Sequence, residues 1–278
     1  MAELSMTIND KSILDLNADL IEYTFGTNKA EYTSYWPRLA PSPLITSLLF
    51  KERPLTVSLL VHGLTKTDAL ISISNITKEL SNATIQFNDA QFLYDVILNG
   101  DPEITWYGDP DTNIDGNNYL YLVKYTLSSG YGYLPVVSQT DTLVFNSKAS
   151  QAITIVPQGN VASPLNINAS VVSGLTTDTG FYFGINKPSA FNISDSFVTN
   201  QFTFMSLNNG DTAEVDTETF KTYRNNVVTP FNFSGDFPVL PVKRSGESIA
   251  INVSPYAVMS DEHDITLEVT TSYKPRYV

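Results

Sequence analysis

Apolar and polar residues alternate in the segment Gln201-Phe-Thr-Phe-Met-Ser-Leu207, where Phe202 and Phe204 fall on one side of an extended chain. This period of two residues is typical of a β-strand with one buried face. The expected buried side chains are Phe202, Phe204 and either Met205 or Leu207. The same pattern opens Leu55-Thr-Val-Ser-Leu-Leu-Val61, which ends close to Gly63. Both segments predict half-buried strands of an antiparallel protein.

Further strands and one helix complete the expected secondary structure. Short β-branched or aromatic runs, separated by turn residues, occur at Ile153–Val156, Asn166–Val171, Phe181–Ile185, Ser248–Val253 and Ile265–Tyr273. Strands at this spacing predict sandwiches or barrels. Apolar residues recur with a period near 3.6 between Asp68 and Leu80, which predicts a helix whose second half Ser74 would cap.

Composition excludes several classes of protein. The 278 residues include no cysteine, so disulfides and thiolate metal sites are excluded. The net charge of −13 disfavours a nucleic-acid-binding task, because phosphates are repelled. With 16% charged and 12% aromatic residues, the chain does not resemble a disordered or coiled-coil protein. No apolar run is long enough for a membrane span and the start lacks a signal pattern, so no membrane partner is expected.

The chain offers few groups for catalysis. His62 follows an apolar run and is expected at a strand end, whereas His263 lies in an acidic turn. A glycosidase would need two carboxylates facing each other across a cleft. The alternating Asp211, Glu214, Asp216 and Glu218 could provide such a pair, but a hairpin with a charged solvent face explains the pattern better. No nucleotide loop or nucleophile elbow occurs, so we expect neither an enzyme nor a cofactor.

The best metal candidate is the segment 111–117, within the polar stretch 108–118 that would form a solvated loop. Asp111, Asn113 and Asp115 alternate before Gly116, as at the start of a calcium loop. The twelfth position is Leu122 instead of a bidentate Glu, so the match ends there. A hairpin turn accounts for the same residues, and we expect no bound metal.

Aromatic residues gather in the first half of the chain. Both tryptophans, Trp36 and Trp106, lie there with many of the tyrosines. Alternation from Tyr119 to Tyr125 places Tyr119, Tyr121 and Tyr125 on one strand face. Because each tyrosine carries a hydroxyl group, we expect this face to be half exposed at an interface.

In order along the chain, these segments resemble the distal tail protein (Dit) family of tailed bacteriophages with long non-contractile tails. The first half resembles the family's belt domain. The matching features are an extended arm with Trp36-Pro37, the strand near Leu55, a helix at Ser72–Leu80 and the segment Ser128-Ser-Gly-Tyr-Gly-Tyr133. The second half resembles the family's galectin-like sandwich. Its matching features are Pro157-Gln-Gly-Asn160, Gly210-Asp211, Asp236-Phe-Pro-Val-Leu240 and the ending Tyr273-Lys-Pro-Arg-Tyr277.

The resemblance implies a mainly β protein of two domains. Residues 1–146 would form a β-sandwich belt domain with one helix, and residues 147–262 a galectin-like β-sandwich. The final strand, in 263–278, would pack back on the first domain.

The resemblance also implies a structural role in a virion that assembles in the host cytoplasm. Such proteins form a hexameric ring between the tail-tube protein and the tail-tip or receptor-binding proteins, and DNA passes through the ring. An acidic lumen would let DNA slide without sticking. The arm from Tyr32 to Pro43 is too rich in proline for an inner strand, so we expect it to lie across a neighbouring subunit. The expected interface residues are Tyr35, Trp36, Pro37, Tyr131, Tyr133, Tyr273, Arg276 and Tyr277.

A carbohydrate-binding module for host recognition is the main alternative. A sugar site of this kind needs Trp, Arg, Asn and His converging on one concave sheet. The second half contains no Trp and only His263, so this alternative has weaker support.

Overall fold

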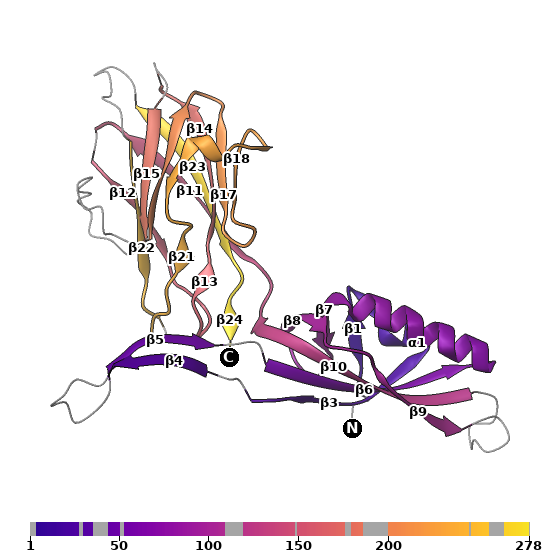
Figure 1. The fold of residues 1–278 in the computed structure, drawn as a ribbon. Helices are drawn as coiled ribbons and strands as arrows, with labels where there is room; N and C mark the ends of the chain where they lie inside the picture. Colours follow the sequence, from indigo (N-terminus) through magenta and orange to yellow (C-terminus); the bar gives the residue numbers. More distant parts are fainter. Residues whose placement is uncertain are drawn as a thin grey trace. The chain divides into compact units, whose positions relative to one another are not determined.

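The computed structural model describes residues 4–27, 30–35, 44–50, 53–108, 119–147, 149–175, 179–185, 200–244, 246–255 and 264–277. Within 30–35 and 44–50 the description covers the backbone. The chain divides into two compact units, Met1–Leu134 and Pro135–Val278. Most described residues lie in β-strands, with one α-helix, so the predicted mainly β fold is confirmed (Figure 1).

The first unit is built on one antiparallel sheet. Its strands follow the order β2-β1-β7-β8-β10-β6-β3, and β9 lies beside β10. Their bounds are β1 Met6–Ile8, β2 Lys11–Ser12, β3 Ala18–Phe25, β6 Arg53–Gly63, β7 Asn82–Phe87, β8 Leu93–Leu98, β9 Glu103–Gly108 and β10 Tyr119–Tyr133. A 3-10 turn, η1 (Ile13–Leu16), precedes β3. The long strand β10 pairs with β6 on one side, and with β8 and then β9 on the other.

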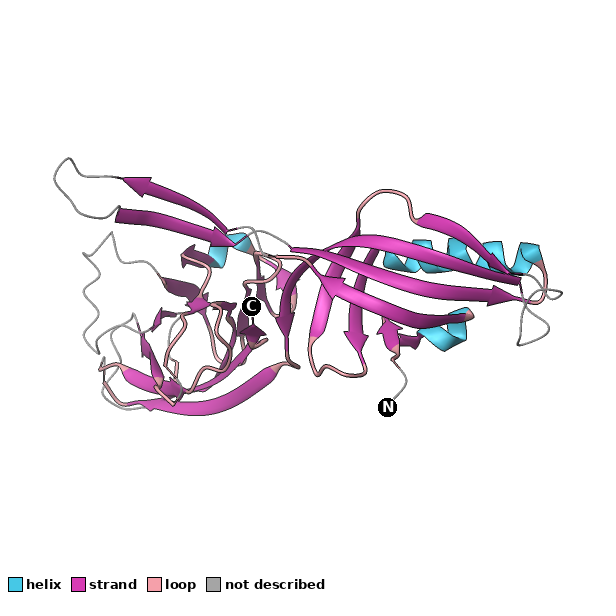
Figure 2. Cartoon of the chain, turned by 90° about the horizontal axis from the view of Figure 1, so that it is seen from below, coloured by secondary structure: helices cyan, strands magenta, loops and turns pink. Residues whose placement is uncertain are grey.

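The helix α1 (Lys66–Leu80) covers one face of this sheet (Figure 2). It begins earlier than predicted, because Thr65 and Asp68 form a capping box in which each side chain accepts the other's backbone N–H. Ser74, the predicted cap, is an exposed residue inside the helix. The layer that packs on the sheet in this unit is therefore a helix. No described helix is long and apolar enough to cross a membrane.

The core of the first unit lies between α1 and the sheet. The predicted strand residues Leu55, Val57, Leu59 and Val61 are all fully buried, as the period of two requires. They meet Ile73 and Ile76 from the helix in the same cluster. Side chains buried here stabilise the fold by about 1.5 to 3 kcal/mol each.

The second unit is a sandwich of two antiparallel sheets. One sheet has the strand order β11-β23-β14-β17-β18-β19 and the other β12-β22-β15-β16-β20. The strands of the first are β11 Val137–Phe145, β14 Asn166–Ser173, β17 Thr212–Asp216, β18 Lys221–Arg224, β19 Val227–Val228 and β23 Ile265–Tyr273. Those of the second are β12 Gln151–Ile155, β15 Thr179–Ile185, β16 Gln201–Leu207, β20 Phe233–Gly235 and β22 Ile249–Pro255. The short elements are β13 Ser163–Pro164, β21 Val239–Leu240, β24 Arg276–Tyr277 and the 3-10 turn η2 Pro230–Asn232.

Phenylalanines fill the core of this sandwich. Phe202 of β16 stacks on Phe183 of β15 with ring centroids 4.9 Å apart, and Phe204 lies edge-on to both. Leu207 is buried as expected, whereas Met205 is exposed. The alternation breaks at Ser206, whose φ of 56° interrupts the regular strand and turns Leu207 inward.

The boundary between the units differs from the sequence-based prediction. Residues 135–146 belong to the second unit, because β11 pairs along its length with β23, from Val137 opposite Tyr273 to Phe145 opposite Ile265. The strand β23 also pairs with β14 and so lies inside the second sandwich. Strand β23 is therefore part of the second sandwich, and the expected packing of segment 263–278 on the first unit stays a prediction. The boundary differs because β11 and β23 pair residues that are at least 120 positions apart, which no local pattern reveals.

The predicted unpaired arm is in part a hairpin. Strands β4 (Ala30–Tyr35) and β5 (Leu44–Phe50) pair with each other, with an irregularity between Thr33 and Ser34. Trp36 and Pro37 lie outside the described residues. The proline-rich stretch follows β4 directly, in keeping with the rule that proline interrupts a ladder of backbone hydrogen bonds.

Candidate interaction surfaces

The predicted interface residues are distributed over several structural environments. Tyr35 is the last residue of β4, where the structure describes the backbone. Tyr131 lies half buried near the end of β10. Tyr133 is buried, and its hydroxyl donates a hydrogen bond of 2.8 Å to Asp95 Oδ1 on the neighbouring strand β8. This buried, hydrogen-bonded side chain supports its own unit, and its expected role at an interface stays a prediction.

The aromatic ending of the chain is anchored in the second unit. Tyr273 is only 4% exposed and belongs to the sandwich core. Its hydroxyl accepts a hydrogen bond from the backbone N–H of Gln158 at 3.1 Å. Tyr273 is therefore part of the core of its own unit, and its expected role at an interface stays a prediction.

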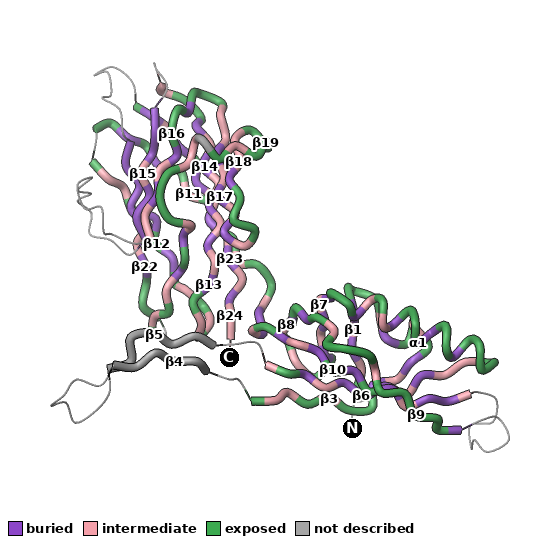
Figure 3. The backbone as a smooth tube through the Cα atoms, in the orientation of Figure 1, coloured by how far each residue is buried: buried purple, intermediate pink, exposed green. Residues whose placement is uncertain are grey.

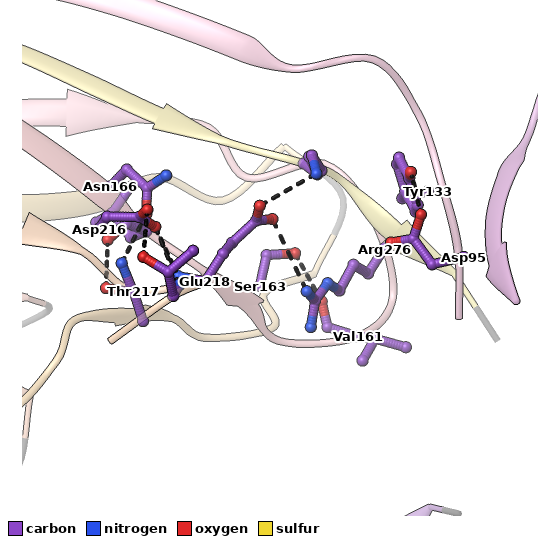
Figure 4. Close-up of polar contacts among 12 residues, drawn as sticks. Asp95, Tyr133, Val161, Ser163, Asn166, Asp216, Thr217, Glu218 and Arg276 are labelled. Atoms are coloured by element: carbon purple, nitrogen blue, oxygen red, sulfur yellow. Dashed lines mark hydrogen bonds and ion pairs between the residues drawn. The ribbon is translucent and has the colours of Figure 1, made fainter. Parts of the chain in front are cut away.

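Glu218 holds the next two basic residues in place. Its carboxylate lies 3.1 Å from Lys274 Nζ and 3.9 Å from Arg276 Nη2 (Figure 4). The turn that presents Glu218 is itself fixed, because Asp216 Oδ1 accepts the backbone N–H groups of Glu218 and Thr219. These two ion pairs orient the C-terminal residues 274–277 on the surface of the second unit.

The backbone of these C-terminal residues also packs closely on the loop that follows β12. The carbonyl oxygen of Arg276 accepts the N–H groups of Asn160 and Val161 at 2.9 and 3.2 Å. Gly159, with φ +97°, allows this approach, because a Cβ atom there would lie 2.5 Å from that oxygen. The segment Gln158-Gly-Asn160 and the C-terminal residues Pro275-Arg-Tyr277 thus contact each other within the second unit. Arg276 and Tyr277 remain half exposed beside it.

The face formed by Tyr119, Tyr121 and Tyr125 is not half exposed as predicted. Tyr125 is completely buried and Tyr121 is 6% exposed, because α1 packs on this side of β10. The hydroxyl of Tyr125 lies 3.3 Å from Thr77 Oγ1 of the helix, which satisfies the buried phenol. Burial also raises the pKa of Tyr125. Only Tyr119 at the strand end is half buried.

An exposed aromatic surface is found instead on β9, and the sequence analysis did not identify it. Ile104, Trp106 and Tyr107 are 48%, 46% and 66% exposed. Most of β9 has the colour of exposed residues in Figure 3. Trp106 packs edge-on against Tyr121, with ring centroids 5.1 Å apart, so its position is defined by the core beside it. Among the described residues, β9 pairs only with β10, which leaves its other edge open. Exposed aromatics on a free strand edge are typical of protein interfaces.

The sequence of β9 and of the residues next to it in the chain is mostly acidic. Asp101, Glu103, Asp109, Asp111 and Asp115 occur within 15 residues that contain no Lys or Arg. Glu103 has one weak described partner, Lys124 Nζ at 4.0 Å. A segment of this composition repels phosphates and attracts basic partners.

The acidic series of the second unit forms a hairpin, as the preferred interpretation required. In β17 Ala213 and Val215 point into the core, so Glu214 lies on the outer face. Asp211 accepts hydrogen bonds from Arg224 Nη2 at 2.6 Å and from Asn225 Nδ2 at 2.8 Å. Burial raises the pKa of Asp211, but bonds from Asn225, Asn208 and Arg224 outweigh it and lower the pKa to about 2. These carboxylates stabilise turns.

No described group of three or more His, Asp or Glu residues could hold a metal ion. The candidate calcium segment 111–117 and His263 lie outside the described residues, so the expectations about them stay predictions. His62 lies half buried near the end of β6, as expected, with Asp19 Oδ2 3.9 Å from its Nε2 atom.

Two solved structures share the architecture of the chain. The Dit protein of phage SPP1, described as a paradigm of the hub adsorption apparatus in phages that infect Gram-positive bacteria, matches with a TM-score of 0.60. The match covers 99% of both chains at 14% identity. The phage P2 baseplate in its activated conformation with Ca matches with a TM-score of 0.50 and 6% identity, over 99% of this chain and 98% of that one. No protein-family profile and no curated protein matches the sequence. The resemblance to Dit proteins is thus confirmed at the level of the fold.

Proposed function

We propose that this chain is a structural, non-enzymatic component of a phage tail tip. Identical subunits form a ring, a hexamer, that joins the tail tube to the baseplate and host-adhesion apparatus. The observation that supports this most is the extent of the match to the SPP1 Dit protein, which covers both units and 99% of both chains. A fold alone does not define a function, so the proposal also depends on surfaces suited to assembly.

A closed ring needs two different surfaces on each subunit, because every contact joins unlike patches. The edge of β9, with Ile104, Trp106 and Tyr107, provides one surface of suitable chemistry. The hairpin of β4 and β5, with Trp36 and Pro37 in the connection, is the proposed second surface. The C-terminal residues Arg276 and Tyr277 belong to the second unit, and we assign them to contacts outside the ring.

The charge of the chain fits a channel for DNA. With a net charge of −13, the chain as a whole would repel a phosphate backbone and not retain it. Tail-tube protein above the ring and tail-tip or receptor-binding proteins below it are the proposed partners. The proposed location is therefore the virion tail, after assembly in the host cytoplasm.

Electron microscopy of the purified protein, together with light scattering, tests the proposal. Rings with a central opening and a mass of several subunits are the expected result. Monomers at all concentrations, or binding to glycans by a monomer, contradict the ring and favour the carbohydrate-binding alternative.

Two substitutions test the surfaces. Trp106→Ala should weaken the ring by about 2 kcal/mol or more per contact if Trp106 is a central contact residue. Phe220→Ala removes another exposed aromatic, 70% exposed and on the second unit, and should leave the ring intact. Trp36→Ala tests the connection in the same way. A folded monomer supports the proposal, and an intact ring excludes that residue as the joint.

A further inference from the structure

The sequence contains two Asn-Gly dipeptides, Asn99-Gly100 and Asn209-Gly210, and both lie in exposed turns. An Asn followed by Gly is chemically labile, because glycine has no side chain to shield its backbone nitrogen from the neighbouring amide carbon. Both glycines have a positive φ, +76° and +84°, and in both cases the space where a Cβ would lie is open. The local sequence and the backbone conformation therefore predict the same reactivity for both sites.

The surroundings of Asn209 prevent the reaction. Its Oδ1 accepts the backbone N–H of Leu175 at 2.9 Å, and its Nδ2 donates to the carbonyl of Leu175 at 2.8 Å. The nitrogen of Gly210 donates to the carbonyl of Val171 at 2.7 Å. The side chain and the attacking nitrogen are thus both held, and all three bonds must break before the amide carbon can be reached.

Asn99 has fewer constraints. Its Nδ2 donates to Ser128 Oγ at 2.8 Å, and its own backbone N–H donates to the carbonyl of Thr126. Within the described part of the chain, no hydrogen bond engages the backbone nitrogen of Gly100. Only the hydrogen bond from Asn99 Nδ2 to Ser128 Oγ must break before the side chain can rotate toward the Gly100 nitrogen.

We propose that Asn99 is a site of spontaneous covalent modification, by deamidation through attack of the Gly100 nitrogen. Hydroxide removes the proton from that nitrogen, which then bonds to Cγ of Asn99 and closes a cyclic imide. The bond from Cγ to Nδ2 breaks, and Nδ2 takes a proton from water and leaves as ammonia, which regenerates the hydroxide. Water then adds to one of the two ring carbonyls and opens the imide to aspartate or isoaspartate. No oxidant or reductant takes part.

The position of Asn99 gives the modification a structural consequence. It lies between Leu98, the end of β8, and Glu103, the start of β9, and both strands pair with β10. Isoaspartate adds a methylene group to the main chain at this joint, and either product loses the bond donated to Ser128. The register of β9, and with it the contact between Trp106 and Tyr121, should change as the modified fraction accumulates.

Peptide mapping by mass spectrometry of the folded protein, incubated in neutral and in mildly alkaline buffer, tests the proposal. Conversion at Asn99 should be roughly tenfold or more faster than at Asn209, because Asn209 must first lose three hydrogen bonds. It should accelerate with pH, and in concentrated urea the two rates should converge. Equal rates in the folded protein, or no conversion at Asn99 while the unfolded chain reacts, overturn the proposal.

Two variants sharpen the test. Asn99→Gln should abolish conversion at this position, since the longer side chain closes the ring poorly, and Gly100→Ala should slow it. In a Trp36→Phe background, where Trp106 is the single tryptophan, fluorescence should shift as conversion proceeds and should stay constant in the Asn99→Gln variant. Conversion without a fluorescence change overturns the link to β9.

Discussion

The ring of Tyr23 in β3 stacks on the ring of Phe87 in β7, with centroids 3.7 Å apart and planes 7° from parallel. In the order of the sheet, β6, β10 and β8 lie between these two strands. The sheet must therefore curl until β7 and β3, which are third and seventh in its strand order, meet. Phe25 and Tyr94 continue this contact at 4.8 Å, and the guanidinium of Arg53 lies 4.0 Å from the centre of the Phe25 ring.

Removing this contact should destabilise the first unit. Phe87 is completely buried, so Phe87→Ala should cost about 3 to 5 kcal/mol of unfolding free energy. Tyr23→Phe keeps the stacked ring and loses only the bond from the hydroxyl to Asp89, so it should cost about 1 kcal/mol. Urea denaturation of both variants checks the difference. Equal losses would mean that the hydroxyl, and not the stacking, closes the sheet.

The same tyrosine should make the unit sensitive to alkali. Burial first, and then the hydrogen bond with Asp89, raise the pKa of Tyr23 to about 12. The unfolded chain loses this proton near pH 10, so the stability it contributes is present below about pH 10 and disappears between about 10 and 12. Denaturation midpoints at about pH 9 and about pH 11.5 should fall further for the wild type than for Tyr23→Phe. Parallel loss in both proteins would contradict the assignment.

Asp211 should contribute stability that acid removes. Its pKa is lowered to about 2 when folded, so it stays charged in the native state where the unfolded chain is protonated. The contribution is present above about pH 4 and is lost between about 4 and 2. Allowing for solvent screening, we expect about 1 to 2 kcal/mol. Acid titration of unfolding, compared between wild type and Asp211→Asn, measures it. The variant should be less stable at neutral pH and should lose less on acidification.

Gly159 should be needed for the C-terminal residues to pack on the loop that follows β12. Gly159→Ala places a Cβ 2.5 Å from the carbonyl oxygen of Arg276 and should cost about 2 kcal/mol or more. Gly246→Ala is the matched control, because φ is similarly positive at +84° but nothing lies within 4 Å. It should cost about 1 kcal/mol from backbone strain alone. Release of the final residues by carboxypeptidase should accelerate only in Gly159→Ala. Acceleration in both variants would mean that strain, and not the close approach, explains the effect.

Local sequence patterns are sufficient to predict most strands and which of their residues share a face. β23 has the predicted bounds, Ile265–Tyr273, and Phe202 and Phe204 are buried together. These features follow from a period of two residues and from turn residues at the strand ends, both of which act within a few residues. The period near 3.6 predicts the helix, although the capping box at Thr65 and Asp68 places its start earlier than the pattern indicates.

Which faces of the strands are covered depends on packing between distant segments. The tyrosine face of β10 is buried because α1 packs on it, whereas Trp106 on β9, opposite Tyr121, remains 46% exposed. The unit boundary moved for a similar reason, since β11 pairs with β23 from the far end of the chain. Periodicity states which side chains point the same way. Whether they meet a helix, another strand or solvent depends on packing between segments distant in sequence, which local patterns do not encode.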